Sequence, residues 1–496
     1  MSALRRIALA AAALLGAVVA SAAGASPDTA IVIRDQAALR AAPRDSAQQQ
    51  AVLWQGEIVE VRAERLDYLQ VYDYRRERGG FVRASHARRL DPGAGAAPEL
   101  LAILRFLREA PGAEALGIAF AMAYVEAAPA EALRGAAGIE ALDALGTFAD
   151  RLAQRASSAA TQSKAAAATL SAHLDVAAGY GVRFATFERG GRMQVCYDGD
   201  AFRRVLAMRS DAAQRARAAL ALTRDECIDP ALGPTERDRL DEARAAMLES
   251  VDSSGLAGFL ANRVAMRRAS VWSAIAYQRM RRGESADAAA RRALGEFGAV
   301  KKAELTDEDL AEYNTAAMRV SASRWAAAPV AAAAAARSLR LVAEPGRPGE
   351  TCVSLFHAKS GAGAPLARRC TYGIVWTGSA TPNREGNALA VAVQQGEAWL
   401  ELWLFHRDAR GWTVRVLPPA ATTPESGYAE LAGWVPGGRE MLVAREARGE
   451  GKYRRSFEVM RLDTLAVARQ APDPDALGPF QRWQDPAWKA ATLSVR

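Results

Sequence analysis

The sequence predicts a multidomain chain with both α and β structure. Its parts are an N-terminal SH3-like β-barrel, a central irregular α-helical domain with a β-hairpin, and a C-terminal antiparallel β domain. Hydrophobic residues alternate with period two over residues 30–90, recur at helical spacing over 98–330, and return to period two over 337–496. A chain of 496 residues, half of them hydrophobic, is long enough to build several cores.

The first residues have the pattern of a secretory signal. Arg5 and Arg6 precede a short apolar run over residues 7–19, and small residues follow. We therefore predict a signal peptide over residues 1–25, cleaved between Ala22 and Ala25. The run is too short to span a membrane, and no later apolar stretch reaches that length. The sequence predicts a periplasmic or otherwise exported protein with no transmembrane segment in the mature chain.

Residues 30–90 carry short apolar runs separated by turn residues. The predicted strands include residues 58–62 and 69–72, and Gly79-Gly80 supplies a turn before a last strand at 81–82. Several short strands joined in this way indicate a small closed or partly open barrel. The side chains expected on its inner face are Leu53, Val59, Val61, Leu69 and Val71.

Four pieces of this segment resemble the bacterial SH3 (SH3b) family in their order. They are Leu39-Arg40-Ala41-Ala42-Pro43, Gly56 to Val61, Tyr68-Leu69-Gln70-Val71 and Gly80-Phe81-Val82. The sequence departs from the family pattern because Tyr68 and Phe81 replace its two tryptophans, and Ala38 replaces its asparagine. The resemblance implies that the segment binds cell-wall peptides or a protein partner of the cell envelope.

Aromatic side chains are the candidate ligand-binding residues of this segment, because a ring offers a large contact area at a low cost in conformational entropy. The candidates are Trp54, Tyr68, Tyr72, Tyr74 and Phe81. The alternative is that Tyr68 and Phe81 belong to the core and that the next domain partly covers the others.

The chain has four cysteines: Cys196, Cys227, Cys352 and Cys370. An even number in an exported chain favours disulfides. Three connectivities exist, and we favour pairing between neighbours because it keeps each bond within one predicted domain. A straight helix over residues 201–223 would separate its ends by roughly 34 Å. Pairing of Cys196 with Cys227 therefore requires the helix to break, and residues 209–211 are the expected place.

The segment 98–330 is predicted to be mainly helical. A β-hairpin over residues 184–197 interrupts it, and residues 157–170 are either an exposed helix or a mobile connection. Gly283 is expected to end one long helix and Ser285 to cap the next. Helices are expected at residues 99–107, 118–125, 139–152, 201–223 with the break, 234–251, 256–282, 285–297 and after 306.

Alternation with period two predicts the C-terminal strands. They are residues 338–342, 352–356, 389–393, 400–405, 412–417, 441–444 and 457–462. The segment that begins at Trp434 (Trp-Val-Pro-Gly-Gly-Arg-Glu-Met-Leu-Val) resembles the Trp-Ser-Pro-Asp-Gly pattern of TolB-like β-propeller blades. Trp376 and Trp483 stand at similar positions before turns. An open meander or a sandwich is the alternative to a propeller.

Catalytic motifs are missing from the sequence. The four histidines, His86, His173, His357 and His406, are far apart, and no phosphate loop or metal-binding spacing is present. Zinc at the cysteines is disfavoured, although His357 follows Cys352. The net charge of +8 comes from arginines interleaved with acidic residues, which argues against nucleic-acid binding.

The sequence thus predicts an exported, non-catalytic binding or scaffold protein of the bacterial cell envelope, without cofactor or metal. Its partner would be a cell-wall peptide or an envelope protein. The alternative is a cell-wall hydrolase, or an activator of one, with its site in the helical domain.

Overall fold

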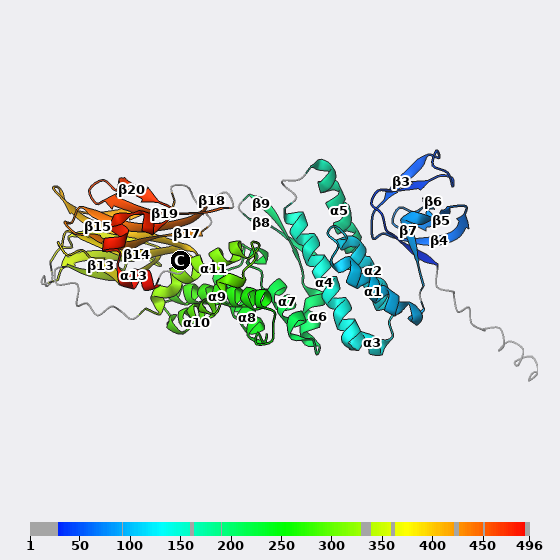
Figure 1. Cartoon of the computed structure of the whole chain (residues 1–496), viewed down its shortest axis with the longest axis horizontal. Helices are drawn as coiled ribbons and strands as arrows, with labels where there is room; N and C mark the ends of the chain where they lie inside the picture. Colours follow the sequence, from blue (N-terminus) through cyan, green and yellow to red (C-terminus); the bar gives the residue numbers. More distant parts are fainter. Residues whose placement is uncertain are drawn as a thin grey trace, which may run out of the picture. The chain divides into compact units, whose positions relative to one another are not determined.

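The computed structural model describes residues 28–91, 93–158, 163–189, 191–328, 339–358, 363–420, 426–449 and 452–491. The predicted signal peptide and residue 338 lie outside these ranges. The chain divides into two compact units, Met1–Ser210 and Asp211–Arg496. Both contain helices and antiparallel sheets, so the predicted mixture of α and β structure is confirmed (Figure 1). Within the described ranges, no helix has the length and apolar character needed to cross a membrane.

The N-terminal sheet has seven strands in the order β3-β2-β6-β5-β4-β1-β7. The strands are β1 Thr29–Val32, β2 Ala37–Arg40, β3 Gln49–Leu53, β4 Ile58–Arg65, β5 Tyr68–Asp73, β6 Arg78–Arg83 and β7 Ala87–Leu90, with the 3-10 turn η1 Ala84–His86 before β7.

This sheet is not a closed barrel, because β3 and β7 remain as its two edges. Of the two predicted forms, closed or partly open, the closed one is therefore wrong. Both edges carry exposed polar residues, such as Gln49 on β3 and Arg88 on β7, as is usual for edges that stay unpaired. The predicted inner face is confirmed, since all five of its side chains are buried in one apolar cluster: Leu53, Val59, Val61, Leu69 and Val71.

Helices complete the first unit and lie side by side over much of their length (Figure 1). They are α1 Ala97–Arg108, α2 Glu114–Ala127, α3 Ala130–Arg134, α4 Ala136–Ser157, α5 Lys164–Gly179 and α6 Asp200–Ala207, with η2 Ala94–Ala96 before α1 and the hairpin β8 Phe184–Arg189, β9 Arg192–Tyr197 before α6. The predicted hairpin is confirmed. Small residues allow close packing: a Cβ at Gly117 would lie 2.5 Å from Phe148.

Three contacts join the N-terminal sheet to these helices. The Tyr180 hydroxyl donates to the carbonyl of Gly56 at 2.8 Å. His173 Nε2, on α5, lies 2.8 Å from Asp35 Oδ1. Gly56 has a φ of +90°, and a Cβ there would lie 2.6 Å from the carbonyl oxygen of Ala115 on α2. The sheet and the helices of this unit are therefore in direct contact, while the inner face of the sheet keeps an apolar cluster of its own.

The second unit begins with a helical part. Its elements are α7 Ala212–Leu222, η4 Asp225–Cys227, α8 Pro234–Glu249, α9 Gly258–Arg281, α10 Asp287–Gly298, η5 Lys302–Glu304, α11 Leu310–Ser323 and η6 Arg324–Ala326. The predicted break is confirmed, because α6 ends at Ala207 and Asp211 caps α7 through a reciprocal pair of hydrogen bonds with Gln214. The expected cap at Ser285 is wrong: Ala286 precedes α10, and no side chain caps that helix.

The predicted C-terminal strands are confirmed over the described residues. The elements are β10 Leu339–Pro345, β11 Thr351–His357, β12 Ala367–Thr371, β13 Ile374–Pro382, β14 Ala388–Gly396, β15 Trp399–Asp408, β16 Gly411–Leu417, β17 Ser426–Val435, β18 Glu440–Gly449, β19 Lys452–Arg461 and β20 Val467–Ala471, followed by η8 Pro474–Ala476, α12 Gly478–Trp483 and α13 Pro486–Ala491.

These strands form three successive meanders, β10–β12, β13–β16 and β17–β20. The second and third belong to one sheet, in which β17 pairs with the beginning of β15. Apolar side chains of both, such as Leu404 and Met441, share one buried cluster. Leu355 of the first meander and Phe405 of the second share another. The meanders are therefore stacked through their faces, and no closed propeller forms among the described residues.

Candidate functional site

A group of half-buried and exposed side chains on β4, on β5 and directly after β5 contains two of the predicted ligand-binding residues. We call it the tyrosine surface: Glu60, Arg62, Tyr72 and Tyr74. The rings of Tyr72 and Tyr74 are 5.0 Å apart at their centroids and meet edge to face. The Arg62 guanidinium lies over the Tyr72 ring, 4.2 Å from its centroid. The surface forms because Glu60 and Tyr72 are direct partners across the two strands.

Hydrogen bonding fixes the polar end of Tyr74 although the residue is 66% exposed. Its hydroxyl donates to Glu60 Oε2 at 2.7 Å. This hydrogen bond lowers the pKa of Glu60, and Arg62 adds to the effect. The same bond raises the pKa of Tyr74. The surface therefore presents an aromatic ring whose position is fixed by a hydrogen bond, together with a guanidinium and a carboxylate. This combination is suited to contact with a polar ligand.

The other three predicted residues lie apart from this surface. Tyr68 is buried, and its hydroxyl donates to Asp45 Oδ1 at 2.6 Å. Trp54 and Phe81 are half-buried. Burial of Tyr68 agrees with the alternative that it serves the core.

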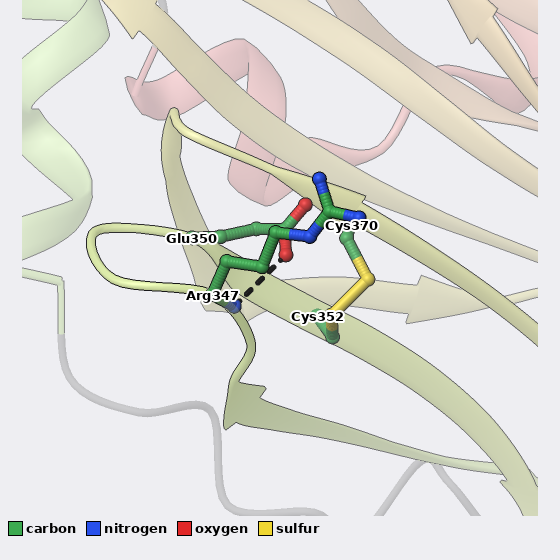
Figure 2. Close-up of a disulfide and its surroundings, with 4 residues drawn as sticks. All are labelled: Arg347, Glu350, Cys352 and Cys370. Carbon is green, nitrogen blue, oxygen red and sulfur yellow. Dashed lines mark hydrogen bonds between the residues drawn. A yellow bond between two sulfur atoms is a disulfide. The ribbon is translucent and has the colours of Figure 1, made fainter.

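The second unit contains a disulfide between Cys352 and Cys370, which are direct partners across β11 and β12. Figure 2 shows the Glu350 side chain close to this bond, with its carboxylate accepting from the backbone N–H of Arg347 at 3.0 Å. Glu350 and the two sulfur atoms lie within 4.8 Å of one another. Metal ions bind cysteine as the thiolate. The two sulfur atoms here are bonded to each other, so they are not metal ligands. The group is therefore a disulfide cross-link beside a carboxylate.

The predicted use of cysteines in disulfides is confirmed for the remaining two residues. Cys196 and Cys227 are both disulfide-bonded, and no cysteine of the described residues is free.

His406, which the sequence analysis did not select, lines a cavity in the second unit. The cavity has a volume of about 850 Å³ and is formed by the end of β15, the β17–β18 turn and the β19–β20 turn. Its lining residues are His406, Val435, Pro436, Gly437, Gly438, Arg439, Glu440, Arg461, Leu462 and Asp463. The segment beginning at Trp434, noted for its resemblance to propeller blades, supplies one wall. The residues are distant in sequence, so spacing alone could not indicate the cavity.

Buried carboxylates in the helical parts are bound to arginines. Arg244 and Arg319 both donate to Asp225, and Arg244 also donates to Asp241 at 2.6 Å. Arg263 donates to Asp309 at 2.6 Å, and these contacts lower the pKa of Asp225 and Asp309 despite opposition from burial. A general acid needs a raised pKa. These carboxylates are therefore suited to holding helices together and poorly suited to glycoside hydrolysis.

Comparison of the chain with protein-family models, with curated proteins and with solved structures finds no significant match.

Proposed function

We propose that the protein is an exported, non-catalytic binding protein of the bacterial cell envelope, and that its N-terminal sheet binds a cell-wall peptide or an envelope protein. The observation that carries the proposal is the tyrosine surface, in which an exposed ring is held by neighbours instead of moving freely. Holding the ring before binding reduces the entropy that association loses. The resemblance of residues 30–90 to the SH3b family supports the same activity.

Export is supported by the signal-like pattern over residues 1–25 and by the disulfides. Disulfides persist in oxidising compartments such as the periplasm. The bond between Cys352 and Cys370 joins neighbouring strands of the second unit.

The alternative, a cell-wall hydrolase or its activator with a site in the helical domain, has less support. The carboxylates there are held by arginines, as described above, and no other feature of the described residues favours this activity.

The proposal is tested by co-sedimentation of the purified full chain with peptidoglycan sacculi, and by pull-down from solubilised envelope proteins followed by identification of the captured protein. A Tyr72→Ala, Tyr74→Ala double variant should lose binding. Phe106→Ala is the matched control, because Phe106 is a 75% exposed aromatic residue on α1 of the same unit. Binding that is equal in all three proteins, or absent from all, would overturn the proposal.

A further inference from the structure

The disulfide between Cys352 and Cys370 has a carboxylate beside it that the covalent bond does not need. A carboxylate oxygen of Glu350 and the two sulfur atoms all lie within 4.8 Å of one another (Figure 2). Zinc binds cysteine sulfur at about 2.3 Å and carboxylate oxygen at about 2.0–2.2 Å in tetrahedral geometry, which places neighbouring ligand atoms less than about 4 Å apart. Opening of the S–S bond would therefore leave three zinc ligands close to the spacing that the metal requires.

The strands hold the two cysteines together without help from the bond. Cys352 and Cys370 are direct partners across β11 and β12, and the pairing of these strands continues on both sides of them. β11 is also paired with β10 over all of its residues. On the opposite face of this sheet, Val353 and Leu355 belong to a buried apolar cluster. Reduction of the disulfide should therefore leave the strands in register and the two thiols facing each other.

The turn before β11 fixes Glu350 independently of the disulfide. Its carboxylate accepts from the backbone N–H of Arg347 at 3.0 Å, and its own N–H donates to the carbonyl of Arg347 at 2.8 Å. The N–H of Gly346 donates to the carbonyl of Glu350 at 2.9 Å. A Cβ at Gly346 would lie 2.8 Å from the Cys352 sulfur, so this turn packs directly against that sulfur atom. A third ligand is therefore preorganised beside the cysteines.

Charge favours a divalent cation in this group once the bond is open. Zinc binds cysteine as the thiolate, so two thiolates and the Glu350 carboxylate bring three negative charges together. A zinc ion reduces this to one negative charge, and Arg347, in the same turn, supplies a positive charge. Within the described part of the chain, no further histidine, cysteine or carboxylate joins the group. The fourth position of a tetrahedral zinc ion would therefore be taken by water.

We propose that, in its reduced state, the protein binds one zinc ion through Cys352, Cys370 and Glu350. The reductant is a dithiol. One of its thiolates attacks the sulfur of Cys370, which is half-buried on the edge strand β12, and the buried Cys352 leaves as a thiolate. The second thiol of the reductant then releases Cys370 and closes the reductant's own disulfide, so two electrons pass to the protein. Zinc binding displaces the protons of the two thiols.

Zinc titration of the full chain tests the proposal, with a chromogenic chelator that competes for the metal. Protein reduced with a phosphine under nitrogen should bind zinc at this group, and oxidised protein should not. The variant Cys352→Ser, Cys370→Ser, reduced in the same way, should bind one zinc ion fewer than the wild type, which separates this group from the other two cysteines. Loss of an outer-shell partner typically weakens metal binding about 10–100-fold, so Glu350→Gln, which removes a direct ligand, should weaken it at least about tenfold. Glu344→Gln is the matched control, because Glu344 is the partner of Cys352 on β10 yet lies outside the group.

Glu350→Gln keeps both cysteines and a side chain of the same size, so this variant should fold, and an unchanged circular dichroism spectrum of the reduced protein checks this. The inference is overturned if the reduced wild type binds no more zinc than the double cysteine variant, or if Glu350→Gln and Glu344→Gln bind zinc equally well. Equal binding by the oxidised and the reduced wild type would also overturn it.

Discussion

Arg324 donates to Glu430 at 2.6 Å, and both side chains are almost completely buried, with exposed fractions of 6% and 4%. The pair joins η6 to the meander β17–β20. The other carboxylate oxygen of Glu430 accepts from Trp488 Nε1 on α13 at 3.1 Å. A single carboxylate therefore holds three elements of the second unit together.

Removing one member of this pair should destabilise the protein more than removing both. Glu430→Gln leaves Arg324 buried without a counter-charge, which typically costs about 3–5 kcal/mol. The double variant Arg324→Met, Glu430→Gln should recover part of this loss. Urea unfolding followed by tryptophan fluorescence measures the effect. Glu284→Gln, in the exposed pair of Arg282 and Glu284, is the control and should change stability by less than about 1 kcal/mol. Equal losses in Glu430→Gln and Glu284→Gln would contradict this account.

Loss of the disulfide between Cys352 and Cys370 should lower the free energy of unfolding by about as much as Glu430→Gln does. The two cysteines are 18 residues apart in sequence, and a loop of this size contributes on the order of 3 kcal/mol when it is closed. The variant Cys352→Ser, Cys370→Ser is measured by urea unfolding without reductant. The control is a thiol assay of the unfolded wild-type protein, which should detect free thiols only after reduction and so show that its cysteines are oxidised. An unchanged midpoint of unfolding would contradict the prediction.

The spacing of hydrophobic residues predicted the strands and helices, because the formation of each strand or helix depends largely on residues near one another in sequence. The apolar run of residues 389–393, which is buried throughout, and the long helix that was expected to end at Gly283 are examples. The helix break at residues 209–211 was predictable because a covalent bond limits distance. Tertiary pairing was not predictable: edges β3 and β7 stay open, and the Tyr68 hydroxyl donates to Asp45, which is distant in sequence. The cavity beside His406 also escaped prediction, because the end of β15 and two turns that are distant in sequence build it.

Gly56→Ala should destabilise the first unit. The new Cβ would lie 2.6 Å from the carbonyl oxygen of Ala115, and Gly56 has a φ of +90°. Overpacking of this kind typically costs about 1–3 kcal/mol, in addition to the strain of a positive φ. Gly112→Ala is the matched control, because Gly112 has a φ of +86° and no atom within 4 Å of an added Cβ. Thermal unfolding compares the two. Equal shifts would show that the contact with α2 is unimportant.

Acid should weaken the first unit through Asp45. Hydrogen bonds from Arg83 and then Tyr68 hold the pKa of Asp45 at about 2, below its ordinary value of 3.8. A lowered pKa means that this contribution to stability is complete above the ordinary value and is lost as the pH falls toward 2. Tyr68→Phe removes one donor and should raise the pKa of Asp45, as measured by carbon NMR of the carboxyl group. Tyr74→Phe should leave Asp45 unchanged and raise the pKa of Glu60 instead. A pKa of Asp45 that stays at about 2 in Tyr68→Phe would refute the assigned cause.

The proposed binding by the tyrosine surface separates into ring and hydroxyl contributions. Tyr74→Ala removes the exposed ring and should weaken binding roughly tenfold, the size expected for an aromatic residue that anchors an interface. Tyr74→Phe keeps the ring and loses only the bond to Glu60, so it should weaken binding less. Arg62→Ala releases the face of Tyr72 and should have an intermediate effect. Quantitative co-sedimentation with the retained ligand ranks these variants. If Tyr74→Ala binds as well as the wild type, the ring at position 74 is not an anchor.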